Sequence, residues 1–82
     1  MVRDRLHNRV RERRRAASGM TQEELAGRGK VTRQSIISIE RGRYRPGVAL
    51  ALRLARALEC RVEDLFELPE DEREHDGGPG GP

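Results

Sequence analysis

Two helix start signals stand close together in the middle of the chain, and they constrain the fold more than any other feature. Thr21-Gln-Glu-Glu24 is a capping box, in which the threonine hydroxyl accepts from the Glu24 amide while the Glu24 carboxylate accepts from the Thr21 amide. Thr32 is a second N-cap residue. The pattern predicts a short helix over about residues 21–28, a tight turn, and a further helix over about residues 32–41.

Three more helices are expected around this pair. Apolar residues spaced by about one turn predict a helix over roughly residues 5–18, although its apolar stripe is thin. Gly42 is suited to the position just after a helix end, and Pro46 to a loop that leads into a new helix. That new helix is expected from about residue 48 to 58. A last short helix is expected over residues 62–66, where acidic side chains suit the positive end of the helix dipole.

Composition favours an all-α fold. Hydrophobic residues make up 34% of the chain, with only one Tyr and one Phe. The core therefore has to be built from Leu, Ile, Val and Ala, which suits short packed helices better than strands. We expect one domain over residues 1–68. Residues 69–82 are first acidic and then rich in Gly and Pro, so they are expected to form a disordered tail.

The net charge of +3 conceals a strong segregation of charge along the chain. Residues 1–61 contain 16 Lys and Arg against 6 Asp and Glu, whereas residues 62–82 contain 1 against 8. A basic folded part of this size is typical of proteins that bind polyanions such as nucleic acids. Composition alone fits a merely solvated surface equally well, because nearly all the basic residues are Arg and a codon bias would produce them.

Several classes of site are disfavoured by residue counts. Cys60 is the only cysteine, which excludes an intramolecular disulfide and a four-cysteine metal site. His7 and His75 lie near the two ends of the chain, apart from any candidate nucleophile or paired carboxylates. We therefore expect no enzyme activity, no metal and no cofactor. Cys60 itself fits a small apolar residue better than a thiol that crosslinks a dimer.

The sequence also indicates where the chain works. Its N-terminal residues lack the apolar stretch of a signal peptide. The longest apolar run, Val48–Leu52, is too short to span a membrane. A cytoplasmic location is therefore expected.

The third predicted helix carries side chains of the kind that recognise bases. At about 100° per residue, one of its sides presents Arg33, Gln34, Ile37, Ser38 and Arg41. Arg forks onto guanine, Gln pairs with adenine, and an apolar side chain can touch the thymine methyl group. Two short helices joined by a tight turn are the geometry that places the second helix in a DNA major groove. Taken alone, Arg33 and Gln34 would more often be ordinary exposed helix residues.

A linked set of motifs extends over residues 10–66. They are Met20-Thr-Gln-Glu-Glu-Leu-Ala26, Val31-Thr-Arg-Gln-Ser-Ile36, Ile39-Glu-Arg-Gly42, Tyr44, Pro46, Ala55-Arg-Ala-Leu58 and Val62-Glu-Asp-Leu-Phe66. In these motifs the chain resembles the Cro/repressor-type helix-turn-helix proteins, the XRE family. The resemblance implies a five-helix, lambda-repressor-like domain that binds double-stranded DNA at pseudo-palindromic operators as a homodimer. The implied function is a transcriptional regulator. A stand-alone domain without a ligand pocket can most simply repress by occupying a promoter, so repression is the default expectation.

The resemblance also implies roles for individual residues. The base-reading residues are Arg33, Gln34, Ile37 and Ser38. The phosphate-binding residues are Gln22, Thr32, Arg41, Arg43 and Arg45. Glu40 is expected to form a structural ion pair with Arg15.

The chain departs from the family pattern at helix ends and in the first helix. Lys30 replaces the turn glycine, so either Lys30 takes a positive φ or Gly29 is used differently. Gly29 stands where a core aliphatic residue is usual, and Glu59 replaces the glycine that usually ends the fourth helix. The run Arg13-Arg-Arg15 makes the first helix one residue longer than the pattern, so its packing is expected to be shifted.

Two other classes of function stay open. An antitoxin or another protein-interaction module could use the same fold, with the acidic C-terminal part as its partner surface or as a DNA mimic. RNA binding is disfavoured because RNA readers usually stack bases on exposed aromatic residues, which are scarce here.

We expect a homodimer joined through the fourth and fifth helices, where Leu52 and Phe66 offer apolar surface.

Overall fold

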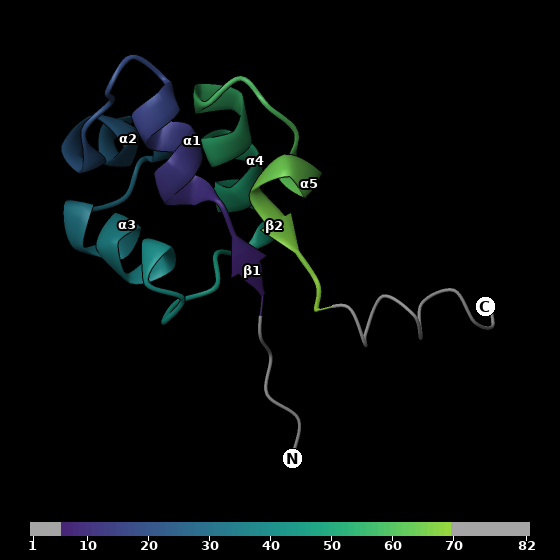
Figure 1. Cartoon of the computed structure of the whole chain (residues 1–82). Helices are drawn as coiled ribbons and strands as arrows, with labels where there is room; N and C mark the ends of the chain where they lie inside the picture. Colours follow the sequence, from purple (N-terminus) through teal and green to yellow (C-terminus); the bar gives the residue numbers. More distant parts are fainter. Residues whose placement is uncertain (1–5, 70–82) are drawn as a thin grey trace, which may run out of the picture.

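The five predicted helices are present in the computed structural model, which describes residues 6–69 (Figure 1). In chain order the elements are β1 (His7–Asn8), α1 (Val10–Ala16), α2 (Gln22–Gly29), α3 (Arg33–Glu40), α4 (Val48–Ala57), α5 (Val62–Leu65) and β2 (Phe66–Glu67). The expected all-α, five-helix fold is confirmed, with a small strand pair added. Of the tail predicted over residues 69–82, all but Pro69 lies outside the described residues.

The strand pair brings the two ends of the described chain together. His7 pairs with Glu67 and Asn8 with Phe66 in antiparallel register, and β1 and β2 lie side by side in Figure 1. Two predicted helix boundaries are therefore wrong, because a helix does not start near residue 5 and Phe66 does not continue the last helix. Both segments gain inter-strand hydrogen bonds by staying extended, and no local sequence pattern signals that pairing.

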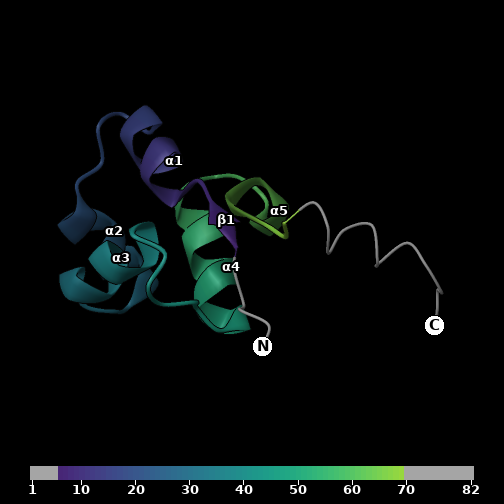
Figure 2. The ribbon, with the colours of Figure 1, turned by 60° about the horizontal axis from the view of Figure 1, so that its bottom comes forward.

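The helices form two groups around α1. Figures 1 and 2 place α2 and α3 together on one side and α4 and α5 on the other. Contacts between elements join the two groups, because α2 packs against both α3 and α4, and α5 packs against α4. The helix-turn-helix unit of α2 and α3 is thus supported from behind by α4 and leaves its other side to solvent.

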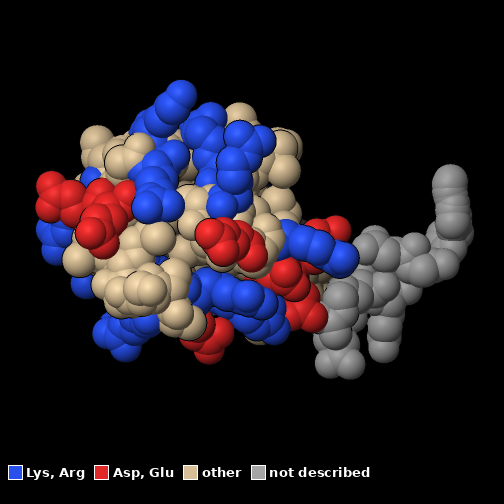
Figure 3. All heavy atoms as spheres, turned by 90° about the horizontal axis from the view of Figure 1, so that it is seen from above, with Lys and Arg blue, Asp and Glu red and all other residues tan. Residues whose placement is uncertain are grey.

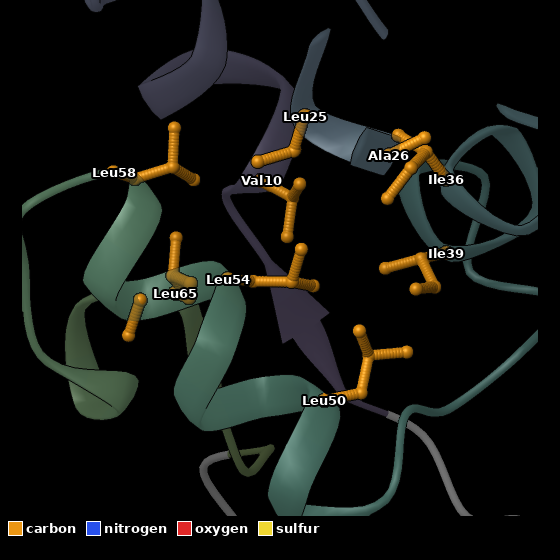
Figure 4. Packing of buried hydrophobic residues seen from close by; sticks show 10 residues of the cluster. Val10, Leu25, Ala26, Ile36, Ile39, Leu50, Leu54, Leu58 and Leu65 are labelled. Atoms are coloured by element: carbon orange, nitrogen blue, oxygen red, sulfur yellow. The ribbon is translucent and has the colours of Figure 1, made fainter. Parts of the chain in front are cut away.

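The core is entirely aliphatic, as the composition predicts (Figure 4). Leu54 of α4 is fully buried, and α4 as a whole contributes more core residues than any other helix. The buried cluster consists of Val10, Leu25, Ala26, Ile36, Ile39, Leu50, Leu54, Ala55, Leu58 and Leu65. Each of the five helices contributes at least one of these side chains, so burying this cluster fixes their arrangement.

Three helices end in the same hydrogen-bonded motif, a Schellman turn with one residue in the left-handed conformation. The left-handed residue is Lys30 (φ 62°) after α2, Gly42 (φ 77°) after α3 and Glu59 (φ 56°) after α4. After α3, for example, the amides of Gly42 and Arg43 donate to the carbonyls of Ile39 and Ser38. Gly42 ends its helix as predicted. Lys30 and Glu59 adopt a conformation that glycine takes at far lower cost.

Gly29 has a packing role of its own. A Cβ atom there would lie 3.1 Å from Leu54 Cδ2 and 3.2 Å from Leu50 Cδ1, closer than side chains normally approach. Its carbonyl oxygen accepts a hydrogen bond from Arg53 Nε at 2.8 Å. The missing side chain therefore allows the end of α2 to approach α4, and the turn takes its left-handed residue from Lys30 instead.

Candidate nucleic-acid interface

The start of α2 is fixed by the capping box that the sequence predicts. Thr21 Oγ1 accepts from the Glu24 amide at 3.0 Å, and Glu24 Oε1 accepts from the Thr21 amide at 2.8 Å. The start of α3 is fixed in a similar way, because Thr32 Oγ1 accepts from the Ser35 amide at 3.1 Å. With both helix starts set by short-range bonds, the turn between them has little freedom, and α3 is held rigidly against α2.

Helix α3 has two sides with different roles. Ile36 and Ile39 are buried in the core, whereas Arg33 and Gln34 are exposed. Within residues 6–69 neither exposed side chain has a hydrogen-bond or ion-pair partner. The other two predicted base readers, Ile37 and Ser38, are partly buried. The division of α3 expected from the helical wheel is therefore present, with its most accessible polar groups in the first turn.

Glu40, at the end of α3, pairs with Arg14 and not with the predicted Arg15. Arg14 donates from Nε to Glu40 Oε2 at 2.7 Å and from Nη2 to Oε1 at 3.3 Å, and both side chains are largely buried. Arg14 lies four residues after the buried Val10, so both point into the molecule from one face of α1. Arg15 is turned away by about 100° and is exposed.

Gln22, the predicted phosphate contact in α2, is oriented by the same carboxylate. Its side-chain Nε2 donates to Glu40 Oε1 at 3.1 Å. A side-chain amide carries two N–H donors. One is bound to Glu40, and the other has no acceptor within residues 6–69. The sequence singled out Gln22, but nothing in it indicated that Glu40 fixes its direction.

The loop after α3 presents several basic side chains. Arg41, Arg43 and Arg45 are all exposed, as is Tyr44 between the last two. The loop itself is anchored at its start, where the Schellman turn of α3 fixes the path of Arg43. These arginines therefore begin from a defined backbone, and all three are exposed.

Thr32 and Asn8 add two contacts at the ends of α3. The Thr32 hydroxyl, predicted to contact phosphate, is engaged in capping and lies 3.1 Å from Ser35 Oγ. Asn8 Nδ2 donates to the carbonyl oxygen of Ile39 at 3.2 Å, so β1 holds the C-terminal end of α3. Asn8 is not recognisable as a contact residue from the sequence, because a side chain that bonds across the fold leaves no local pattern.

Charged groups are unevenly distributed over the surface. Figure 3, which looks onto the molecule from the top of Figure 1, shows Lys and Arg side chains in several groups, with acidic side chains in smaller groups beside them. Independently of this view, Glu67 of β2 accepts a hydrogen bond from Arg9 Nη2 at 2.8 Å, so at least one acidic side chain is paired with an arginine. The basic character expected from the sequence is thus exposed on this face.

Cys60 packs against the core cluster and is partly buried. Burial raises the pKa of its thiol above the ordinary value, so the thiol stays protonated near neutral pH. Within residues 6–69, no group of three His, Cys, Asp or Glu side chains is arranged to hold a metal ion. The helices in this part of the chain are also too short and too polar to cross a membrane.

Comparison with known proteins places this geometry in a family. A helix-turn-helix family model, HTH_3, matches residues 10–65. An uncharacterized HTH-type transcriptional regulator from Methanothermobacter thermautotrophicus is 56% identical over 63 residues, which span 76% of this chain and 90% of the relative. Another from Archaeoglobus fulgidus is 45% identical over 67 residues, spanning 82% of this chain and 94% of the relative.

Solved structures share the fold as well. The restriction-modification controller protein C.AhdI from Aeromonas hydrophila superposes with a TM-score of 0.62 and 34% identity, over 68% of this chain and 83% of that one. The clp gene regulator ClgR from Corynebacterium glutamicum gives a TM-score of 0.61 and 33% identity, over 67% of this chain and 57% of that one.

Proposed function

Because the chain belongs to the helix-turn-helix family of transcriptional regulators, we propose that it binds a specific site on double-stranded DNA through α3. The observation that carries this proposal is the exposed first turn of α3. Arg33 and Gln34 project from it without a partner among residues 6–69, while the opposite side of the same helix is locked in the core.

In this proposal the two exposed side chains supply most of the sequence discrimination. Arg33 makes a bidentate contact with a guanine and Gln34 with an adenine, each discriminating by about 1–3 kcal/mol. Ile37 and Ser38 follow one turn later on the same side, where Ile37 can contact a thymine methyl group and Ser38 can bond to a base edge.

Phosphate contacts hold α3 in the groove. Gln22 contributes the amide N–H that Glu40 leaves available. We assign further contacts to Thr32, Arg41, Arg43 and Arg45. Three of these residues are cationic, and they stand on a loop whose start is fixed by the end of α3. Such contacts set orientation and contribute the salt-dependent part of the affinity.

A second copy of the chain completes the site. One recognition helix reads only a few base pairs, so specificity asks for two copies about 34 Å apart on a pseudo-palindrome. The proposed dimer surface is the outer side of α4, where Val48 is 77% and Leu52 is 53% exposed. Phe66 of β2 is partly buried against the core and contributes at the margin.

Repression by promoter occupancy is the mode of action we propose, because the described fold consists of the DNA-binding unit itself. A bound dimer excludes other proteins from the same duplex without any further activity. Since its proposed partner is chromosomal DNA, the chain is expected to work in the cytoplasm, in association with the nucleoid.

The test is a salt titration of binding to duplexes selected from a random pool. The loop arginines Arg41, Arg43 and Arg45 give six phosphate contacts in a dimer, which corresponds to a slope of log K against log salt of about −5. A slope of this size or steeper on the selected duplex, with weaker binding to single-stranded RNA of equal length, supports the proposal. A slope near zero, or equal affinity for the RNA, contradicts it and favours a protein-interaction module.

A further inference from the structure

A basic cleft lies between α1 and the first turn of α2, beside the residues assigned to DNA above. It has a volume of about 460 Å³ and is open to solvent. Three guanidinium groups line it, those of Arg11, Arg14 and Arg15, together with Thr21 and Gln22. No Asp or Glu is among its lining residues. A cleft lined by one sign of charge favours an anionic ligand.

The three arginines of this cleft differ in what they already bind. Arg14 is committed inside the protein, because Glu40 takes its Nε and Nη2 and the Met20 carbonyl oxygen takes its Nη1 at 2.8 Å. Arg11 and Arg15 are exposed and have no hydrogen-bond or ion-pair partner within residues 6–69. They are four residues apart on α1 and so project from the same side of the helix.

Two positive charges remain in the cleft once internal pairing is taken into account. Arg14 neutralises Glu40, whereas Arg11 and Arg15 have no partner within residues 6–69 and stand one helical turn apart on α1. Their guanidinium groups can each donate two parallel N–H bonds to phosphate oxygens, the geometry for which Arg is suited.

Gln22 connects the cleft to the proposed DNA site. It lines the cleft, and its remaining amide N–H is the group assigned to a backbone phosphate. We infer that Arg11 and Arg15 hold the DNA backbone next to that phosphate, so that α1 forms part of the DNA-binding surface. This inference rests on the proposed function and adds two cationic contacts per subunit to it.

The added contacts should change the salt dependence of DNA binding by a measurable amount. The three loop arginines give a slope of about −5 in a dimer, whereas five arginines per subunit give about −9. The experiment compares three proteins on the same selected duplex: the unaltered chain, the R11Q/R15Q variant and an R13Q/R28Q control. Arg13 and Arg28 are exposed and line a different cleft, so the control removes the same total charge from another surface.

The expected slopes are about −9 for the unaltered chain and the control, and about −5 for R11Q/R15Q. A further variant, R11K/R15K, keeps the charge and should retain a slope near −9. Thermal unfolding of all the variants should match that of the unaltered chain, because none of the four arginines has an ion-pair partner within residues 6–69.

Failure of this inference is separable from failure of the proposed function. If the unaltered chain binds duplex DNA with a steep slope, and R11Q/R15Q changes it no more than R13Q/R28Q does, α1 makes no phosphate contact while the role of α3 stands. If the unaltered chain does not bind duplex DNA, the proposed function fails and this inference fails with it. In that case the basic cleft would be tested against acidic protein partners.

Discussion

Arg14 and Glu40 form a two-point ion pair across the protein, with Nε to Oε2 at 2.7 Å and Nη2 to Oε1 at 3.3 Å. The side chain of Arg14 is 10% exposed and that of Glu40 is 5% exposed. Since Gln22 donates to the same carboxylate, one acidic group joins α1, α2 and α3. This single carboxylate therefore links the three helices and orients Gln22, which is a proposed phosphate contact.

Replacing Arg14 with Gln should destabilise the fold by about 3–5 kcal/mol, because it leaves the Glu40 charge buried without its main partner. The matched change at the neighbouring Arg15 should alter the free energy of unfolding by less than about 0.5 kcal/mol, since that side chain is exposed. Urea denaturation of the two variants measures the difference. Equal losses for Arg14→Gln and Arg15→Gln would show that this ion pair contributes nothing specific.

Replacing Arg33 or Gln34 with Ala should reduce binding to the selected duplex by about 1–3 kcal/mol and leave binding to random duplex almost unchanged. Arg43→Ala is the control. Arg43 lies beyond Gly42 and is assigned to phosphate, so its loss should weaken both kinds of binding by similar factors and flatten the salt slope by about one unit per subunit. Mobility-shift titrations give the two affinities. An unchanged ratio of specific to random binding in both α3 variants would mean that α3 does not read the sequence.

Replacing Lys30 with Gly should stabilise the fold by about 1 kcal/mol, because Lys30 has a φ of 62° that glycine adopts without a steric penalty. Lys30→Ala removes the same charge but keeps the Cβ, so it should give no such gain. Glu59→Gly, at φ 56° after α4, should behave like Lys30→Gly. The variants are compared by their urea denaturation midpoints, provided that the dependence of the unfolding free energy on urea concentration, the m value, is unchanged. A gain from Lys30→Ala as large as that from Lys30→Gly would point to charge and not to backbone strain.

Replacing Leu52 with Glu should abolish self-association and leave the monomer folded, because the side chain is already 53% exposed. Ala16→Glu places a new carboxylate at another exposed helical position, the last residue of α1, and should leave the dimer intact. Sedimentation equilibrium, with and without the selected duplex, reports the assembly state. If the Leu52→Glu variant dimerises with unchanged affinity, the dimer interface does not lie on the outer side of α4.

The parts of the fold that were predictable depend on short-range signals. The capping box at Thr21 and the cap at Thr32 place two helix starts correctly, and Gly42 marks a helix end as expected. Each of these features involves residues at most a few positions apart, so the sequence alone contains the information. The two outward side chains of the first turn of α3, Arg33 and Gln34, follow from the same register.

The features that were missed depend on contacts between distant residues. The pairing of Asn8 with Phe66 keeps the chain extended before α1, and α1 therefore begins at Val10. The pairing of Glu40 with Arg15 was expected from the family resemblance. In the structure Val10 and Arg14, four residues apart, face inward from α1, so Arg14 forms the ion pair and Arg15 is exposed. For the turn after α2, the sequence left open whether Lys30 takes a positive φ or Gly29 is used differently. In the structure Lys30 has the positive φ, and Gly29 allows the close approach of Leu50 and Leu54.

The division of α3 into a buried side and an unpartnered side has a consequence for how such a protein can change over generations. Substitutions at Arg33 and Gln34 break no internal bond within residues 6–69, so a new pair of side chains there costs the fold little. Substitutions at Ile36 or Ile39 would open the core. In the proposed function, where these two side chains read the DNA sequence, the preferred site can therefore change in small steps, each through a folded protein, while the buried side of α3 stays the same.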